Sequence, residues 1–195
     1  MKVFTHFGLW SVGLAKAETQ TTDAERDCLA RHASGKKRLA EIGVWHGVTT
    51  CRLRKAMAAD AILYAIDPYP VGRLGFSTQY VIGHREVSKV PNGSLKWIRQ
   101  TGAEAAHSLA GAGPFDFVFI DGDHSYEGLQ ADWTAWKPLL ASAGIVALHD
   151  SRSTPERPID DAGSVRFTRD VILHDHCFEV AEAVNSLTVL RRICS

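Results

Sequence analysis

The sequence predicts an α/β protein with a doubly wound, mostly parallel seven-stranded sheet that ends in an antiparallel hairpin. Five strand-like apolar runs alternate with five helical segments, which favours a parallel sheet covered by helices on both faces. The run FDFVFI at 115–120 is apolar almost throughout, as expected of a strand buried on both faces. Two β-rich runs close the chain, and only Asn185 and Ser186 separate them, which is typical of a hairpin. Neither a linker nor an internal repeat interrupts residues 1–195, so we expect a single domain.

Each element has its own signal in the sequence. The first helix is expected to begin at Thr22, because Thr22 and Glu25 have the spacing of a capping box and an apolar stripe follows. Strands are predicted at 38–42, 62–67, 95–99, 115–120 and 144–148, and the hairpin strands at 177–184 and 187–193. Helices are predicted at about 49–59, 77–89, 103–109, 126–140 and 164–174.

The composition excludes several classes of partner. Lys and Arg together number 22, as do Asp and Glu, so the formal net charge is zero. There is neither a basic surplus for nucleic acid nor a polybasic run for a membrane surface. Four cysteines are scattered along the chain without a C-x-x-C pair: Cys28, Cys51, Cys177 and Cys194. We expect reduced thiols in a cytoplasmic protein, and neither a zinc site nor a disulfide framework.

Residues 1–21 stand outside the alternating pattern. Three large aromatic side chains lie there: Phe4, Phe7 and Trp10. The apolar stretch 3–14 faintly resembles a secretory signal, but polar residues such as His6 interrupt it. Aromatic residues outside a core need a surface to cover. We therefore expect a lid over a ligand cleft, or an arm that pairs with a second copy in a homodimer.

The stretch LAEIGVWHG ends the first strand and contains Glu41, Gly43 and Gly47. Glycine lacks the Cβ that would keep a ligand from the backbone, and Glu41 offers a carboxylate at the strand end. The second strand ends in Asp67, where dinucleotide-binding folds place the acid that takes the ribose hydroxyls. Trp45 stands where a second glycine would admit a pyrophosphate. The loop therefore favours a ligand with a ribose but no phosphate.

Polar residues also follow the fourth and fifth strands. They are Asp121, Asp123 and His124 after the fourth, and His149 and Asp150 after the fifth. Because parallel strands present their carboxyl ends to one crevice, these side chains are expected to meet there. Such oxygen-rich clusters suit a hard divalent ion, with Asp121 and Asp150 as the predicted ligands. His149 is expected to be a ligand, a general base or a locally bonded histidine, and either Asp123 or Ser125 is expected to cap the following helix.

Longer motifs surround these residues: FIDGDHSYEG at 119–128, DWTAWKPL at 132–139 and GIVALHD at 144–150. The chain resembles the class I S-adenosylmethionine-dependent methyltransferases from about residue 39 to residue 150. It is most similar to their small-molecule O-methyltransferase branch. The resemblance implies a Rossmann-like fold and methyl transfer from S-adenosylmethionine to a small-molecule acceptor at a hydroxyl oxygen.

The resemblance also implies roles for individual residues. Glu41, Gly43 and Gly47 match the loop that holds the methionine part of the cofactor, and Asp67 matches the acid on the ribose hydroxyls. Further cofactor contacts are expected at Glu104, beside the adenine, and at Asp121 and His124.

The same resemblance bears on metal and catalysis. Asp121 and Asp150 match positions that hold magnesium in metal-dependent relatives, and His149 and Asp121 are the expected catalytic residues. Some relatives carry two acids where this chain has His149 and Asp150, so the metal requirement is left open.

Two other functions share the predicted sheet. A nicotinamide-dependent oxidoreductase would need a loop open to pyrophosphate, and both Trp45 and the final hairpin argue against it. A catalytically silent cofactor-binding or interaction protein would keep the fold without the polar crevice. We expect neither nucleic acid nor a membrane as a partner.

Overall fold

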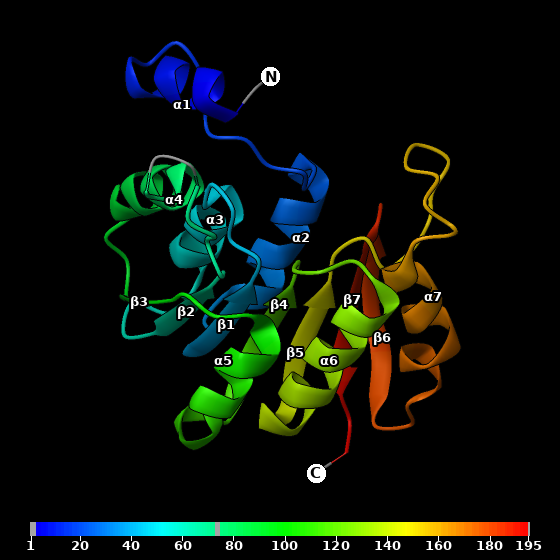
Figure 1. Ribbon diagram of the computed structural model, residues 1–195. Coiled ribbons are helices and arrows are strands. Elements are labelled where there is room, and N and C mark those ends of the chain that lie inside the picture. The colour runs from blue at the N-terminus through cyan, green and yellow to red at the C-terminus, as the bar shows by residue number, and fades with distance from the viewer. Residues whose placement is uncertain (1–2, 73–74, 195) are drawn as a thin grey trace.

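A single sheet organises the protein, which the computed structural model describes over residues 3–72 and 75–194 (Figure 1). Its strands are β1 (Arg38–Ile42), β2 (Ile62–Ile66), β3 (Ser94–Ile98), β4 (Phe115–Ile120), β5 (Leu140–Leu148), β6 (Phe178–Val184) and β7 (Leu187–Arg192). The order is β3-β2-β1-β4-β5-β7-β6. Neighbours among β1 to β5 are parallel, and β7 runs antiparallel to both β5 and β6. The predicted seven-stranded sheet with a terminal hairpin is confirmed.

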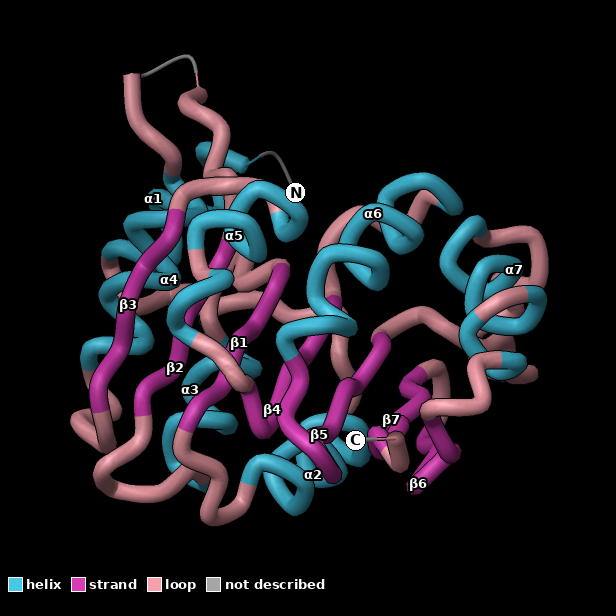
Figure 2. The backbone as a smooth tube through the Cα atoms, turned by 90° about the horizontal axis from the view of Figure 1, so that it is seen from below, coloured by secondary structure: helices cyan, strands magenta, loops and turns pink. Residues whose placement is uncertain are grey.

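Helices cover both faces of this sheet, as the view from below shows (Figure 2). One face carries α2 (Asp23–Ala33), α3 (Val48–Ala56) and α4 (Thr78–Ser88), and the other carries α5 (Gly102–Ser108), α6 (Tyr126–Trp136) and α7 (Gly163–Asp170). The predicted capping box of Thr22 and Glu25 is present at the start of α2. None of the described helices is long and apolar enough to cross a membrane.

The alternation of side chains along the strands produces two apolar layers. On β1, Ala40 and Ile42 pack in the layer beneath α5 to α7, whereas Leu39 packs in the layer beneath α2 and α3. Burial of a large apolar side chain stabilises the fold by roughly 1.5–3 kcal/mol. Trp136 is fully buried edge-on against Phe115, with ring centroids 5.2 Å apart. These layers fix the strand ends on which the polar residues stand.

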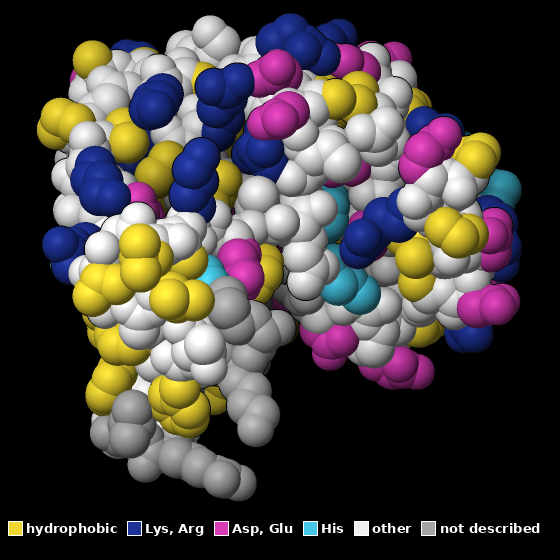
Figure 3. Space-filling view, turned by 90° about the horizontal axis from the view of Figure 1, so that it is seen from above, with side chains coloured by type: hydrophobic (Ala, Val, Ile, Leu, Met, Phe, Trp, Pro, Cys, Tyr) yellow, Lys and Arg dark blue, Asp and Glu magenta, His cyan; other side chains and the backbone are white. Residues whose placement is uncertain are grey.

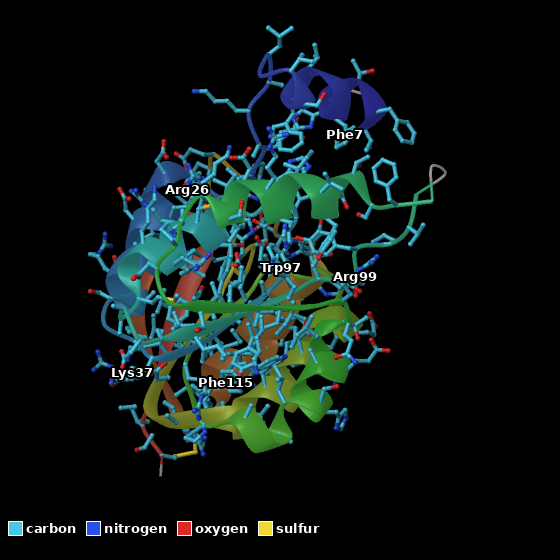
Figure 4. All side chains as sticks on the ribbon, turned by 90° about the vertical axis from the view of Figure 1, so that its left-hand side faces the viewer. Phe7, Arg26, Lys37, Trp97, Arg99 and Phe115 are labelled. Atoms are coloured by element: carbon cyan, nitrogen blue, oxygen red, sulfur yellow. A yellow bond between two sulfur atoms is a disulfide. The ribbon has the colours of Figure 1, made fainter. Side chains whose placement is uncertain are left out.

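The N-terminal segment forms a helix, α1 (Val3–Ser11), that lies above α4 (Figure 4). The indole N–H of Trp10 donates to Glu86 Oε1 at 2.8 Å, and Phe7 packs on Phe76 with ring centroids 5.9 Å apart. The aromatic residues therefore have a helix as partner within the same chain. Whether the segment acts as a lid or as a dimer arm stays a prediction, and residues 1–2 of this segment lie outside the described residues.

The observed element boundaries differ most from the predicted ones around β5. The predicted helix at 126–140 ends at Trp136, and a short 3₁₀ turn with Pro138 leads into β5 at Leu140. Proline lacks the N–H that an α-helix needs and clashes with the preceding turn, so the helix cannot continue through it. The predicted helix at 164–174 likewise ends early, at Asp170.

The expectation that all four cysteines are reduced is wrong. Cys177 and Cys194 form a disulfide, with their Cα atoms 4.8 Å apart. One cysteine precedes β6 and the other follows β7, so the hairpin brings together two residues separated by 17 positions. The absence of a C-x-x-C pair could not exclude this pairing. Cys28 and Cys51 are free thiols.

Candidate active site

A cavity of about 670 Å³ lies at the carboxyl ends of β1, β2 and β4. The strand order reverses here, because β2 lies on one side of β1 and β4 on the other, and open α/β sheets bind ligands at such a point. Its wall includes residues 18–20 of the N-terminal segment, 42–45 after β1, 66–68 after β2, 100–103 after β3, 121–124 after β4, and 128, 131 and 132 of α6. Histidine and acidic side chains are visible around the hollow in the middle of this face (Figure 3).

The two glycines of the first loop are required by the packing of the protein chain itself. Gly43 has φ of +85°, and a Cβ there would stand 1.9 Å from the main-chain oxygen of Asp121. Gly47 has φ of +73°, and its Cβ would stand 2.5 Å from Val87 of α4. Gly43 also lines the cavity, whereas Gly47 is not among the described lining residues. Close approach of β4 and α4, rather than of a ligand alone, explains the spacing.

Asp67 lines the cavity and also orders the glycine loop. Its Oδ2 accepts the main-chain N–H groups of Val44 and Trp45 at 3.1 and 3.0 Å, and its Oδ1 accepts that of Tyr69 at 2.9 Å. A carboxylate oxygen has two lone pairs, so Oδ1 keeps acceptor capacity for a hydroxyl. The predicted ribose contact is compatible with this geometry and stays a prediction.

Glu41 lies behind the loop rather than at the cavity. It is fully buried, and neither carboxylate oxygen has a hydrogen-bond partner among the described residues. Burial, together with the charges of Asp121 and Asp67, raises the pKa of Glu41 well above its usual range. This environment favours the protonated, neutral form of the carboxyl. Direct contact with a cofactor stays a prediction, and the geometry gives it no support.

The segment after β3 reaches the cavity through its first residues. Residues 101–103 line the wall, whereas Glu104 accepts the N–H and hydroxyl of Thr101 and closes a capping box on α5. Asp132 of α6 lines the cavity beside this turn. Burial and the charge of Asp123 raise the pKa of Asp132 to about 6. Sequence reasoning missed Asp132, although the motif DWTAWKPL begins with it.

His149 is buried behind Asp121. Its Nδ1 stands 2.8 Å from Asp121 Oδ1, and its Nε2 lies 3.7 Å from Glu25 Oε2 of α2. Burial alone would lower the pKa of His149, but its interactions with Asp121, Glu25 and Asp150 outweigh burial and raise it to about 10. The ring is therefore a cation at neutral pH and holds the Asp121 carboxylate in place. Its predicted role as a general base remains untested, and this charge state disfavours it.

Glu25 completes this arrangement from the opposite side. Sequence reasoning assigned it only to a helix cap, but its Oε1 also accepts the N–H of Ser186 at 3.0 Å and the hydroxyl at 2.8 Å. Burial would raise the pKa of Glu25, but His149, Thr22 and Ser186 lower it to about 2. No sequence spacing could have linked residues that are 161 positions apart.

Asp150 is engaged by an arginine, Arg157, that no sequence signal had identified. Arg157 of the following loop donates from Nε and Nη2 to the two carboxylate oxygens, one to each. These bonds, together with the charge of His149, outweigh burial and lower the pKa of Asp150. Asp150 is not among the described lining residues. The structure thus brings Asp150 near the site but does not present its oxygens to the cavity.

His124 is the imidazole that faces the cavity. Its side chain is 36% exposed, and its Nε2 lies 3.6 Å from Asp121 Oδ1 and 3.9 Å from Asp150 Oδ2. Asp123 lines the cavity and accepts the N–H of Ser125, while Ser125 caps α6. The cap was expected at either residue, and Ser125 provides it. The turn after β4 therefore places one carboxylate, Asp121, and one imidazole, His124, side by side on the wall.

A family model described as a methyltransferase domain matches residues 40–151, more than half of the chain. The chain therefore belongs to this methyltransferase family. The predicted resemblance to the class I S-adenosylmethionine-dependent methyltransferases is confirmed. No curated protein matches the sequence.

Solved structures share the fold at low sequence identity. Cofactor-bound Rv0187 from MTB is 15% identical with a TM-score of 0.71, covering 98% of this chain and 90% of that one. The O-methyltransferase from Bacillus cereus in complex with SAH is 13% identical with a TM-score of 0.66, covering 98% and 92%. An rRNA methylase from Streptococcus thermophilus is 13% identical with a TM-score of 0.62, covering 91% and 100%. These likenesses show the Rossmann-like methyltransferase fold alone.

Proposed function

We propose that the protein transfers the methyl group of S-adenosylmethionine to a hydroxyl oxygen of a small-molecule acceptor. The observation that carries this proposal is the cavity at the reversal of strand order, with Asp67, Asp121 and His124 on its wall. Neighbours of this fold include an O-methyltransferase in complex with SAH, which supports the choice of cofactor and of acceptor atom.

The wall suits the cofactor in three places. Asp67 keeps acceptor capacity for ribose hydroxyls, and Gly43 presents bare backbone to the cavity. Asp132, beside residues 101–103, offers a carboxylate to the exocyclic amine of an adenine. When bound, S-adenosylmethionine supplies an electrophilic methyl group on a sulfonium. The task left to the protein is to orient an oxygen toward it and to remove that oxygen's proton.

His124 is the residue that we assign to the proton. It faces the cavity beside Asp121, whose charge would stabilise the imidazolium that forms. His149 holds Asp121 from behind and stays charged. A general base contributes about 100- to 10,000-fold to the rate, which sets the loss expected when it is removed.

The charge of the wall favours a neutral or cationic acceptor. Five carboxylates line the cavity: Glu18, Asp67, Asp121, Asp123 and Asp132. Among the described lining residues the only ionisable base is His124, with neither lysine nor arginine. A polyanion such as RNA needs basic side chains that contact its phosphates. The acidic cavity wall therefore disfavours RNA, the substrate class named for the rRNA methylase neighbours, as the acceptor.

The described residues do not fit a magnesium ion shared by Asp121 and Asp150. Arg157 donates to both oxygens of Asp150, and Asp150 is not among the described residues that line the cavity. Magnesium requires carboxylate oxygens that are free to coordinate. The predicted ion therefore has no place in the mechanism proposed here, and the assigned proton transfer depends on His124 alone.

The test begins with calorimetric titration of S-adenosylhomocysteine and of NAD. We expect binding of the first and not of the second, because Trp45 stands on the wall where a pyrophosphate would lie. Tighter binding of NAD would refute the cofactor assignment, whereas cofactor binding without transfer to any acceptor would support the catalytically silent alternative.

Transfer is then measured with radiolabelled methyl groups on neutral polyols, phenols, amines and ribosomal RNA. His124→Gln should lower kcat about 100- to 10,000-fold and leave the affinity for S-adenosylhomocysteine nearly unchanged. His174→Gln, at an exposed position after α7, is the matched control and should keep full activity. Transfer to RNA, or full activity of the His124 variant, would overturn the acceptor class or the assigned base. The cytoplasmic location and the homodimer stay predictions.

A further inference from the structure

A second cluster of metal-ligand side chains lies outside the cavity, between α2 and the edge strand β6. It consists of Cys28, His32 and Glu182, whose thiol, imidazole and carboxylate atoms all lie within 4.8 Å of one another. Cys28 and His32 are four positions apart on α2, which places them on one face of the helix. His32 Nε2 stands 2.9 Å from Glu182 Oε2. We propose that these three residues bind a zinc ion that clamps α2 to β6.

A bulge in β6 aims Glu182 at the helix. The register between β6 and β7 shifts between Val180 and Glu182. Phe178 packs against the core beneath α5 to α7, whereas Val184 packs against the core beneath α2 and α3. An even spacing along a regular strand would place both side chains on the same face. The extra residue of the bulge switches the later side chains of β6 to the opposite face of the sheet. Glu182 therefore points toward Cys28 and His32 on α2.

The donors match zinc in chemistry and in spacing. Zinc takes thiolate, imidazole and carboxylate ligands in a tetrahedral site, which separates donor atoms by about 3.5 Å. The present separations need only small side-chain adjustments to reach that value. A soft thiolate beside nitrogen and oxygen donors disfavours magnesium and calcium. A water molecule would complete the tetrahedron on the open side.

Arg31 orients the Glu182 carboxylate by a hydrogen bond, as outer-shell residues do for carboxylates that bind a metal. Its Nη2 donates to Glu182 Oε1 at 2.5 Å, which leaves Oε2 for the ion. The Arg31 side chain is 58% exposed, so solvent screens its repulsion of the ion. Such outer contacts orient the ligand that touches the metal.

Binding must exchange protons for the ion. The thiolate is the metal ligand, so the Cys28 thiol loses its proton to solvent when the ion binds. The imidazole of His32 must present a nitrogen lone pair to the ion, so any proton on that nitrogen moves to the other ring nitrogen or to solvent. Binding therefore becomes stronger as the pH rises.

Two other clusters do not carry the same inference. His6, Glu18 and His46 also have donor atoms within 4.8 Å, but the two imidazoles are stacked with an interplanar angle of 6°. Nitrogen lone pairs lie in the ring plane, and two parallel, displaced planes cannot converge on one ion. Asp121, His124 and His149 belong to the candidate active site already described, where His149 lies behind Asp121.

The test uses the full chain, without thiol reductant so that the disulfide stays closed, and titrates Co²⁺ and Zn²⁺. We expect one ion per chain and, for cobalt, a thiolate-to-metal charge-transfer band in the near ultraviolet. Cys28→Ser should abolish the band. Cys51→Ser, which removes the other free thiol, is the matched control and should keep it.

Two milder variants keep the test decisive if Cys28→Ser, a change at a buried position, folds poorly. His32→Gln and Glu182→Gln lie at partly exposed positions and should each weaken binding at least tenfold while the fold is retained. Zinc should raise the melting temperature of the unaltered chain and of the Cys51 variant only. Absence of the band, a band that survives in Cys28→Ser, or unchanged affinity in both milder variants would overturn the proposal.

Discussion

Acid should loosen the N-terminal segment through one buried histidine, His46. Its ring stacks between Trp45 and His6, with centroid distances of 4.6 and 5.1 Å. Its Nδ1 accepts the main-chain N–H of Glu18 at 3.0 Å, so the neutral ring holds the segment that forms part of the cavity wall. Burial, and then the nearby charge of His6, lower the pKa of His46 from 6.5 to about 4, against a smaller opposing effect of Glu18.

The lowered pKa of His46 determines whether stability rises or falls as the pH changes. A histidine whose pKa is lower in the folded state stabilises the fold fully above pH 6.5, and the contribution is lost as the pH falls toward 4. The gap between the two pKa values is equal to about 3.4 kcal/mol over the whole titration. At pH 5 the loss is already about 2 kcal/mol. It cannot exceed the free energy that holds the segment in place, because detachment frees the ring.

The measurement compares the unaltered chain with His46→Asn in urea denaturation at pH 7.5 and pH 5. Asparagine offers an oxygen near the position of Nδ1 and does not titrate. His149, whose pKa is raised to about 10, gains stability over the same interval, but it does so equally in both proteins. The unaltered chain should therefore lose up to about 2 kcal/mol relative to the variant.

Limited proteolysis between α1 and α2 provides the local measurement. Cleavage should accelerate at pH 5 in the unaltered chain more than in His46→Asn. Equal pH dependence of the two proteins, in both denaturation and proteolysis, would refute the reasoning.

Three changes at the site have expected outcomes of their own. Asp67→Asn keeps an oxygen that can accept from the N–H groups of the loop, but it loses the negative charge. Calorimetry should show that S-adenosylhomocysteine binds this variant roughly 10- to 150-fold more weakly, which corresponds to about 1.5–3 kcal/mol. Unchanged affinity would contradict the assignment of Asp67 to the ribose hydroxyls. Gly43→Ala puts a methyl group 1.9 Å from a main-chain oxygen and should lower the free energy of unfolding by at least about 3 kcal/mol, measured against Gly35→Ala, which has φ of +70° and open space. Excess chelator should leave methyl transfer intact, because Arg157 donates to both oxygens of Asp150; a loss of activity that magnesium reverses and zinc does not would restore the shared metal site.

The strands were predictable because their signals are local. The apolar run that forms β4 and the two-residue turn before β7 can each be recognised from a few consecutive residues. Helix α1 was not predicted, because its contacts are with residues about 70 positions further along the chain: Phe7 packs on Phe76, just before α4, and Trp10 bonds to Glu86 of α4. The same limitation hid the disulfide, whose cysteines become neighbours only when the hairpin pairs.

The site was predictable in place but not in detail. The carboxyl ends of parallel strands meet by topology, and residues after β1, β2 and β4 do line one cavity. The residues after the fourth and fifth strands were expected to share one crevice, but His149 and Asp150 after β5 are not among its described lining residues. A strand end does not show which of two consecutive side chains faces the crevice. His149 and Asp150 face inward to α2 and to Arg157, whereas His124, one turn beyond β4, faces the cavity. Those orientations depend on partners in distant elements.

The contact between Glu25 and Ser186 has a consequence for how a newly made chain acquires its site. Glu25 leaves the ribosome early, and its partner follows 161 residues later, an interval of about 10–30 s at ordinary rates of synthesis. Until then the carboxylate that faces His149 lacks two of its hydrogen bonds, and Asp121 is held by an incompletely anchored ring. The nascent chain therefore cannot complete the support of Asp121 until the hairpin has been synthesised. Messages truncated before the hairpin should yield products that protein quality control removes, rather than partly active enzyme.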